Sequence, residues 1–253
     1  MQRFSVRFAP LALFFVVSVA CSSPEGETLA AGQVVSVVHS PASVNAFIID
    51  LGDGTAALID SGVEPEAGPL LGALETLGLA VADIAAVFFT HGHEDHVAGA
   101  LAFPDARRFA LGAESELIAG RQNPERPFPS FGDPEETGVE VTDVLEDGAV
   151  VPLGNTSVEV FAVPGHTEGS AAYLVHGVLF LGDTASRKDE STMEGATWIF
   201  SRDPDESAAS LASLAARLEP RATDVTTLAF GHSPALEEGL TPLLDFAAEV
   251  ELP

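Results

Sequence analysis

The sequence predicts an α/β fold in which two β-sheets pack together and helices lie on the outside. Three observations support this prediction. The chain has 253 residues and 46% hydrophobic content, which is enough to bury one sizeable core. Short apolar segments alternate with segments whose apolar residues recur at helical spacing. This combination of strands and helices occurs once in each half of the chain, although no sequence repeat marks the two halves.

A β-meander and a strand, helix, strand unit are expected in the first half. Strands are predicted over residues 33–39, 45–50, 55–61 and 84–90. Asp53 and Gly54 lie between the second and third of these strands, and Asp-Gly is typical of a hairpin turn. Residues 66–78 have leucines at helical spacing and end at Gly78, so a helix is expected there.

The second half is expected to contain a run of strands followed by helices. A helix near residues 96–103 precedes it, and strand and turn signals recur through Ala110. The proline-rich segment 121–134 breaks all periodicity, so it is predicted to be a loop and is a candidate lid. Strands are then predicted over 139–144, 157–163, 170–175, 178–181 and 225–230, with helices over 205–218 and from Thr241.

The N-terminus predicts export. Arg3 and Arg7 precede an apolar run over residues 9–20, which is too short to span a bilayer comfortably and ends at Cys21. Residues 1–20 resemble a bacterial lipoprotein signal peptide, with Cys21 as the lipidated residue. Because Ser18 stands where such signals usually have leucine, an ordinary cleaved signal is the alternative.

A short tether and one domain are expected after the signal peptide. Residues 21–32 are predicted to be the tether and residues 33–253 the domain. The protein is expected in the periplasm or on the cell surface, touching the membrane only through the anchor at Cys21. This residue is the only cysteine, so the fold holds no disulfide and no thiolate ligand or nucleophile.

The charge of the chain limits its partners. Lys and Arg number 11 against 38 Asp and Glu, giving a formal net charge of −27, which opposes nucleic acid and anionic lipid surfaces. A small-molecule substrate is therefore expected, and a polyanionic one would need a locally basic site. Arg187 and Lys188 are candidates for such an anion contact, with plain solvation as the alternative. The sequence indicates no oligomeric state.

A cluster of histidines predicts a metal site. His91, His93, Asp95 and His96 directly follow the buried strand 84–90, so one turn carries four potential ligands. Such a density of imidazole and carboxylate groups favours metal binding and allows one segment to face two adjacent ions. Imidazole and carboxylate ligands without thiolate suit zinc, and they also suit iron or manganese.

Three more candidate ligands share one setting, in which a glycine stands beside the ligand at the end of a predicted strand. They are His166, Asp183 and His232. Two other histidines, His39 and His176, have no such neighbours and are interpreted as structural. Asp50 and Asp53 are interpreted as turn residues.

The motif His-x-His-x-Asp-His, followed by a glycine-flanked His, Gly-Asp and Gly-His, resembles the metallo-β-lactamase superfamily, with a metal site like that of glyoxalase II. The resemblance implies an αββα sandwich with two Zn²⁺ along one edge. It implies that Asp183 bridges the two ions and that Asp60 orients a ligand. For Asp60, a strand-end cap is the alternative. The implied ligands are His91, His93 and His166 for the first metal, and Asp95, His96 and His232 for the second.

The function implied is hydrolysis of an ester, thioester, lactone or related bond by a hydroxide that bridges two metals, with Asp95 accepting the water proton. The alternatives are a mononuclear iron enzyme that oxidises persulfides, a β-lactamase, and a metal-binding lipoprotein without catalysis. The missing core cysteine and the presence of Asp183 argue against the β-lactamases. Glyoxalase II carries a helical domain after its last ligand, whereas about one helix follows His232. Segments 121–134 and 186–200, the latter with Trp198 and Phe200, are candidates to roof or line the site.

Overall fold

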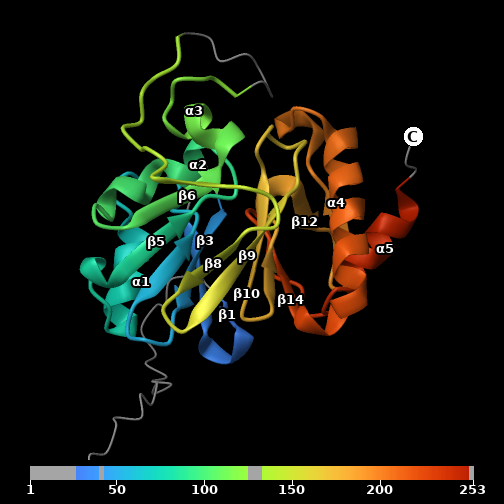
Figure 1. The fold of residues 1–253 in the computed structure, drawn as a ribbon, viewed down its shortest axis with the longest axis horizontal. Coiled ribbons are helices and arrows are strands. Elements are labelled where there is room, and N and C mark those ends of the chain that lie inside the picture. The colour runs from blue at the N-terminus through green and yellow to red at the C-terminus, as the bar shows by residue number, and fades with distance from the viewer. Residues whose placement is uncertain (1–26, 40–42, 125–132, 251–253) are drawn as a thin grey trace, which may run out of the picture.

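Two β-sheets pack face to face in the computed structural model, which describes residues 27–39, 43–124 and 133–250. Helices cover the outer face of each sheet, so the layers run helix, sheet, sheet, helix (Figure 1). This is the αββα sandwich expected from the sequence. Within the described residues, no helix is both long and apolar enough to cross a membrane. The predicted signal peptide and Cys21 lie outside the described residues.

The first sheet contains seven strands in the order of the chain. They are β1 (Thr28–Leu29), β2 (Val34–His39), β3 (Val44–Asp50), β4 (Ala56–Ile59), β5 (Ile84–Phe88), β6 (Arg107–Leu111) and β7 (Asp143–Leu145). Strands β1 to β4 form an antiparallel meander, whereas β4 to β7 pair in parallel. The carboxyl ends of the parallel strands therefore meet at one edge, where sites of α/β proteins form.

The second sheet has the order β14-β11-β10-β9-β8. Its strands are β8 (Val150–Leu153), β9 (Thr156–Ala162), β10 (Ala171–Val175), β11 (Val178–Phe180) and β14 (Thr227–Ala229). Only β11 and β14 pair in parallel within this sheet. A separate hairpin, β12 (Ala185–Arg187) with β13 (Met193–Gly195), follows β11.

Helices on the two outer faces complete the layers. The α-helices are α1 (Gly68–Leu77), α2 (Glu94–Val97), α3 (Ser115–Ile118), α4 (Pro204–Leu218) and α5 (Thr241–Glu249). The 3₁₀ helices are η1 (Ala30–Gly32), η2 (Val81–Asp83), η3 (Ala98–Ala102), η4 (Gly112–Glu114), η5 (Gly182–Thr184), η6 (Trp198–Phe200) and η7 (Glu219–Asp224). Helix α4 begins at Pro204 because Asp203 caps it, its carboxylate accepting the amide hydrogens of Asp205 and Glu206.

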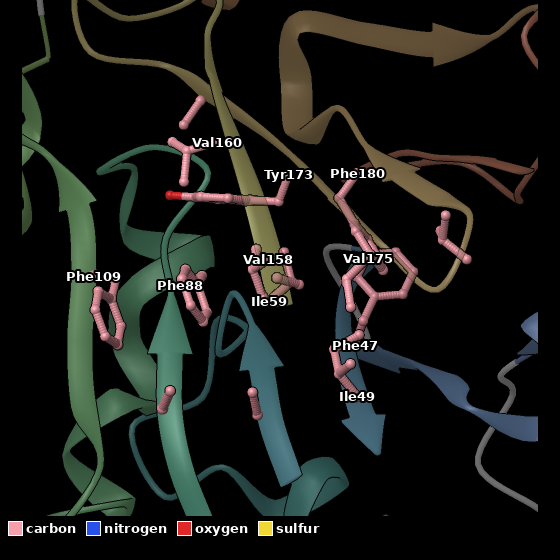
Figure 2. Packing of buried hydrophobic residues seen from close by; sticks show 14 of the residues in the cluster. Phe47, Ile49, Ile59, Phe88, Phe109, Val158, Val160, Tyr173, Val175 and Phe180 are labelled. Carbon is pink, nitrogen blue, oxygen red and sulfur yellow. The ribbon is translucent and has the colours of Figure 1, made fainter. Parts of the chain in front are cut away.

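The main core lies between the sheets, where aromatic rings from both meet (Figure 2). Phe88 and Phe109 of the first sheet stack at 4.6 Å, and Phe47 meets Phe180 of the second sheet edge-on at 4.9 Å. Tyr173 is fully buried, and its hydroxyl donates to a main-chain carbonyl at 2.7 Å, so the core leaves this polar group satisfied. This packing fixes the strands whose ends carry the candidate ligands.

Several element boundaries differ from the sequence prediction. The predicted tether over 21–32 is too long, because Leu29 is buried and β1 already pairs with β2. The strand expected over 139–144 is wrong for its first residues, since pairing with β6 begins at Asp143. The helix expected over 96–103 starts earlier, as α2, and continues as a 3₁₀ turn.

The elements that were not expected from the sequence include β8 and the β12–β13 hairpin. Strand β8 contains Pro152, which argues against a strand except at a sheet edge, and β8 is an edge strand. The β12–β13 hairpin consists of two three-residue strands, too short to show a periodic apolar pattern.

Candidate metal centre

The structure brings all seven predicted ligands together at the strand-end edge. Each follows a strand of one of the two sheets, and the ends of β5, β9, β11 and β14 supply them. Their donor atoms form two groups, each within 4.8 Å: a first group of His91, His93 and His166, and a second group of Asp95, His96 and His232. Asp183 joins them, because its carboxylate lies within the same distance of His91 and His96. Side chains separated by up to about half of the chain therefore share one site.

The first group consists of three imidazoles that converge on His93. Its Nδ1 atom lies 3.0 Å from Nε2 of His91 and 3.1 Å from Nε2 of His166. One nitrogen holds at most one proton, so it cannot donate a full hydrogen bond to both neighbours. Three nitrogens that face one another at this spacing form a natural site for a cation.

Two hydroxyl groups fix the outer nitrogens of this group. Ser201 donates its hydroxyl to the carbonyl of Thr197, so it accepts the Nδ1 hydrogen of His166 at 3.0 Å. Thr90 donates to Asp60 at 2.7 Å, so it accepts the Nδ1 hydrogen of His91 at 3.0 Å. Both histidines are therefore held in the tautomer that leaves the Nε2 lone pair facing the site.

The second group lies on the other side of Asp183. Nε2 of His232 is 3.2 Å from Oδ2 of Asp95, and Nε2 of His96 is 3.9 Å from the same oxygen. The Asp183 carboxylate lies 3.4 Å from His96, 3.3 Å from His232 and 3.8 Å from His166. Asp183 therefore stands between the two groups, where a bridging ligand would have to be.

Two buried polar atoms that lack a hydrogen bond indicate that the site is built for a cation. Nε2 of His96 and Oδ1 of Asp183 are shielded from solvent and lie 3.4 Å apart as an ion pair, but neither forms a hydrogen bond with any described residue. Buried donors and acceptors are almost always paired, so two such atoms side by side need an explanation. A metal ion between them would satisfy both, and the imidazole and carboxylate donor set fits zinc.

The electrostatics differ between the two groups. Burial lowers the pKa of His166 to about 3 and that of His91 well below its usual range, so both imidazoles are neutral. Burial also lowers the pKa of His96 and His232, but neighbouring carboxylates, Asp183 above all, outweigh it. The pKa of His96 is raised well above its usual value and that of His232 to about 10. Without metal, the second group therefore holds protons that the first does not.

Asp60 contacts His96 on the side away from the site. Its Oδ2 atom accepts the Nδ1 hydrogen of His96 at 2.8 Å, and its Oδ1 accepts the amide hydrogen of Thr90 at 2.8 Å. Asp60 has a left-handed backbone conformation, with φ of 57°, at the point where the chain leaves β4. The Asp60 carboxylate is thus placed to orient the candidate ligand His96, as the family resemblance implied. The turn at the end of β4 sets the position of this carboxylate.

Glu114 and Asn45 support the site but were missed by sequence reasoning. Glu114 is buried, and its carboxylate accepts the amide hydrogens of Gly92 at 2.6 Å and Gly169 at 2.7 Å. The Asn45 amide donates to the carbonyls of Phe230 at 2.9 Å and Ser233 at 3.0 Å, on either side of His232. The contacts that tie both residues to the site are with main-chain atoms, which leave no pattern in the sequence.

A cavity of about 530 Å³ opens over the donor groups. Its lining includes Ser186, Thr197 and Phe200 from the segment predicted to line the site, and Pro124 from the predicted loop. Residues 125–132 of that loop lie outside the described residues, so a lid stays a prediction. Trp198 is 68% exposed and does not line this cavity.

The candidate anion contact at Arg187 and Lys188 is not found at this cavity. The Arg187 guanidinium donates to the carbonyls of Asp189 and Ala235, and neither base lines the space. Of the two histidines interpreted as structural, His176 donates to the carbonyl of Asp50 at 2.8 Å in a turn. The other, His39, is fully buried beside Gly62 and belongs to none of the groups of converging donors.

Comparison with known proteins gives one matching family. The sequence model of the Metallo-beta-lactamase superfamily matches residues 39–232, which include the whole candidate site. Curated relatives include hydroxyacylglutathione hydrolases from Aeromonas salmonicida (36% identical over 127 residues; 48% of this chain, 41% of the relative) and Thermosynechococcus vestitus (37% over 137 residues; 52% and 44%). The matched region spans less than half the length of these two relatives.

Solved structures with the same fold include two metallo-β-lactamases. One is the BLEG-1 B3 enzyme, with a TM-score of 0.61, 23% identity and coverage of 84% of this chain and 96% of that one. The other is BJP-1 of Bradyrhizobium japonicum, with a TM-score of 0.63, 20% identity and coverage of 86% and 88%. At these identities the likeness shows the fold alone.

Proposed function

The chain belongs to the metallo-beta-lactamase superfamily, and from this premise we propose that it is a dinuclear metal-dependent hydrolase of an ester, thioester or lactone. One observation carries the proposal: the Asp183 carboxylate stands between two groups of converging donors, 3.3 Å from His232 and 3.8 Å from His166. A single iron ion could also use this carboxylate together with two histidines, but it would leave the donors on the other side of Asp183 without a metal. The names of the curated relatives favour the thioester among these bonds.

The donor set assigns a role to each side chain. His91, His93 and His166 would hold one ion, Asp95, His96 and His232 the second, and Asp183 would contact both. Zinc suits these ligands, and iron or manganese share them. Bound metals of this kind lower the pKa of a shared water and polarise the acyl oxygen of a substrate.

The chain's own residues hold the reacting groups in place. The hydrogen bonds of Asp60, Thr90 and Ser201 keep the imidazole rings from turning, so the lone pairs stay aimed inward. Asp95 is partly exposed to the cavity, and its carboxylate is the acceptor proposed for the proton of the attacking water. No serine or cysteine nucleophile is required.

Export and lipid anchoring through Cys21 are proposed on the sequence of residues 1–21 alone. The experiment is expression of the full chain in a bacterial host, with Cys21→Ser as the comparison. The unchanged chain is expected in the membrane fraction with acyl chains detected by mass spectrometry, and Cys21→Ser in the soluble exported fraction. Recovery of both proteins in the same fraction would contradict the anchor.

Metal analysis combined with a substrate panel tests the catalytic proposal. Purified protein is expected to contain about two zinc ions per chain and to hydrolyse at least one of an ester, a thioester and a lactone. One iron per chain with oxygen uptake on a persulfide would replace the proposal by the dioxygenase. Turnover of a β-lactam alone would replace it by the β-lactamase, and two bound metals without any turnover would favour a binding protein.

A further inference from the structure

The walls of the cavity differ in chemistry from its floor. The floor consists of the candidate metal ligands, whereas the walls are formed mainly by Pro124, Ala185, Thr197 and Phe200. Phe200 is 51% exposed, so one side of its ring is available to a bound molecule. A cavity of about 530 Å³ with such walls is of the size and polarity that small organic ligands occupy.

No lysine or arginine of the described residues lines this cavity. The arginines around it are already engaged by other partners. Arg121 pairs with Glu116 and Glu140, Arg202 pairs with Glu206, and the Arg187 guanidinium donates to two main-chain carbonyls. An anionic group entering the cavity would therefore meet no free lysine or arginine among the described residues of its walls.

Among the described residues that line the cavity outside the candidate ligands, the charged one is the acidic Glu94. Glu94 is exposed and lines the rim of the cavity beside the candidate ligand Asp95. The whole chain carries a formal net charge of −27, so the surrounding field adds to this local repulsion. A like charge placed against a binding site is a means of rejecting a ligand as well as failing to attract it.

We propose that this site selects substrates whose acyl part is uncharged and apolar, such as an alkyl chain or a ring lying on Phe200, and that it rejects acyl groups bearing a carboxylate. This inference rests on the proposed hydrolytic function and names its substrate class. Each methylene group buried against an apolar wall strengthens binding roughly threefold to fourfold. A carboxylate at the same position gains nothing there and loses its hydration.

A matched pair of ligands isolates the charge. Hexanohydroxamic acid and adipic acid monohydroxamate have the same chain length and the same metal-binding group, and they differ in one terminal carboxylate. Trp198 is the only tryptophan and lies two residues from Phe200, so its fluorescence reports binding to the zinc-loaded protein without any turnover. The hexanoyl ligand is expected to bind at least about tenfold more tightly than the adipyl ligand, and acetohydroxamic acid more weakly than the hexanoyl ligand.

Hydrolysis of the corresponding p-nitrophenyl esters gives the second measurement. The value of kcat/KM is expected to be at least about tenfold higher for the hexanoate than for the adipate monoester. Phe200→Ala is expected to reduce the ratio of hexanoate to acetate hydrolysis, whereas Leu101→Ala, an exposed apolar residue outside this cavity, should keep the ratio. Thr197→Arg places a cation on the wall and is expected to raise the relative rate of the adipate monoester at least about tenfold.

The two measurements separate the substrate class from the function. Equal or tighter binding of the adipyl ligand, or a chain-length preference lost in Leu101→Ala instead of Phe200→Ala, would overturn the inference even if the esters are hydrolysed. A hexanoyl preference in binding without hydrolysis of any ester, thioester or lactone would support the inference and contradict the proposed hydrolase.

Discussion

The Nδ1 atom of His96 lies 2.8 Å from Oδ2 of Asp60, on the opposite side of the ring from the Nε2 atom that faces Asp183. Both residues are almost completely buried. Because the same carboxylate also accepts the hydroxyl of Thr90, which in turn accepts from His91, one acid orients a ring in each of the two donor groups. The strand end at Asp60 thereby controls the direction of two candidate ligands.

Asp60→Asn is expected to weaken zinc binding by about 10- to 100-fold. The amide would present a donor where the carboxylate now accepts hydrogen bonds from His96 and Thr90, so at least one ring would lose its fixed tautomer. The measurement is zinc content after dialysis against buffered zinc, together with kcat/KM. Asp53→Asn, in an exposed turn, is the matched control and should keep its zinc. Full zinc retention in Asp60→Asn would contradict the orienting role.

Asp183→Ala is expected to lose the second zinc ion and at least about a hundredfold in kcat/KM. The substitution removes the carboxylate that stands between the two donor groups and that contacts both His96 and His232. Metal analysis and activity are measured on the same sample, with Asp189→Ala in the exposed β12–β13 turn as control. Unchanged zinc content and rate would rule out the bridging position.

Binding of the second metal is expected to depend more steeply on pH than binding of the first. The pKa of His232 is raised to about 10 in the metal-free protein, whereas that of His166 is lowered to about 3. Zinc needs the unprotonated nitrogen, so the second group must release protons at neutral pH and the first need not. Each released proton raises affinity about tenfold per pH unit. Zinc titrations between about pH 6 and pH 8 measure both affinities, and equal slopes would contradict the assignment.

The meeting of the candidate ligands at one edge could be predicted from the sequence because of where they stand in the chain. His91, Asp183 and His232 each follow an apolar strand, and strand ends of an α/β fold meet at a shared edge. Residues whose partners are main-chain atoms could not be predicted in this way. Asn45 donates to carbonyls about 185 residues away, and no side-chain pattern marks such a contact.

The fold was predictable at the level of its layers but less so at its edges. Central strands such as β5 are continuous apolar runs because both faces are buried. Edge strands have less to bury, so β8 with its proline gave no strand pattern, and β1 is only two residues long. The position of Leu29 in the core depends on its pairing with β2 and not on local periodicity.

Glu114 joins the two loops that carry the first donor group, because it accepts from Gly92 between His91 and His93 and from Gly169 just after His166. Burial raises the pKa of Glu114, although the hydrogen bonds from Thr167, Gly169 and Gly92 oppose this.

Glu114→Gln replaces one acceptor oxygen by a donor, which would then face an amide hydrogen, so we expect a loss of about 2 kcal/mol. For a chain of this size that loss lowers Tm by roughly 4–8 °C. Affinity for the first zinc ion is expected to fall by about tenfold, since the His91 and His166 loops would no longer be tied together.

Glu116→Gln is the matched control for this prediction. Glu116 stands two positions along the chain, is exposed and pairs with Arg121 on the surface, so its change should lower Tm by less than about 2 °C. Thermal unfolding with and without zinc separates the two effects. A general loss of packing would lower Tm equally in both conditions, whereas loosened ligand loops would reduce the stabilisation that zinc provides. An unchanged zinc-dependent shift in Glu114→Gln would show that Glu114 supports the fold without positioning the metal ligands.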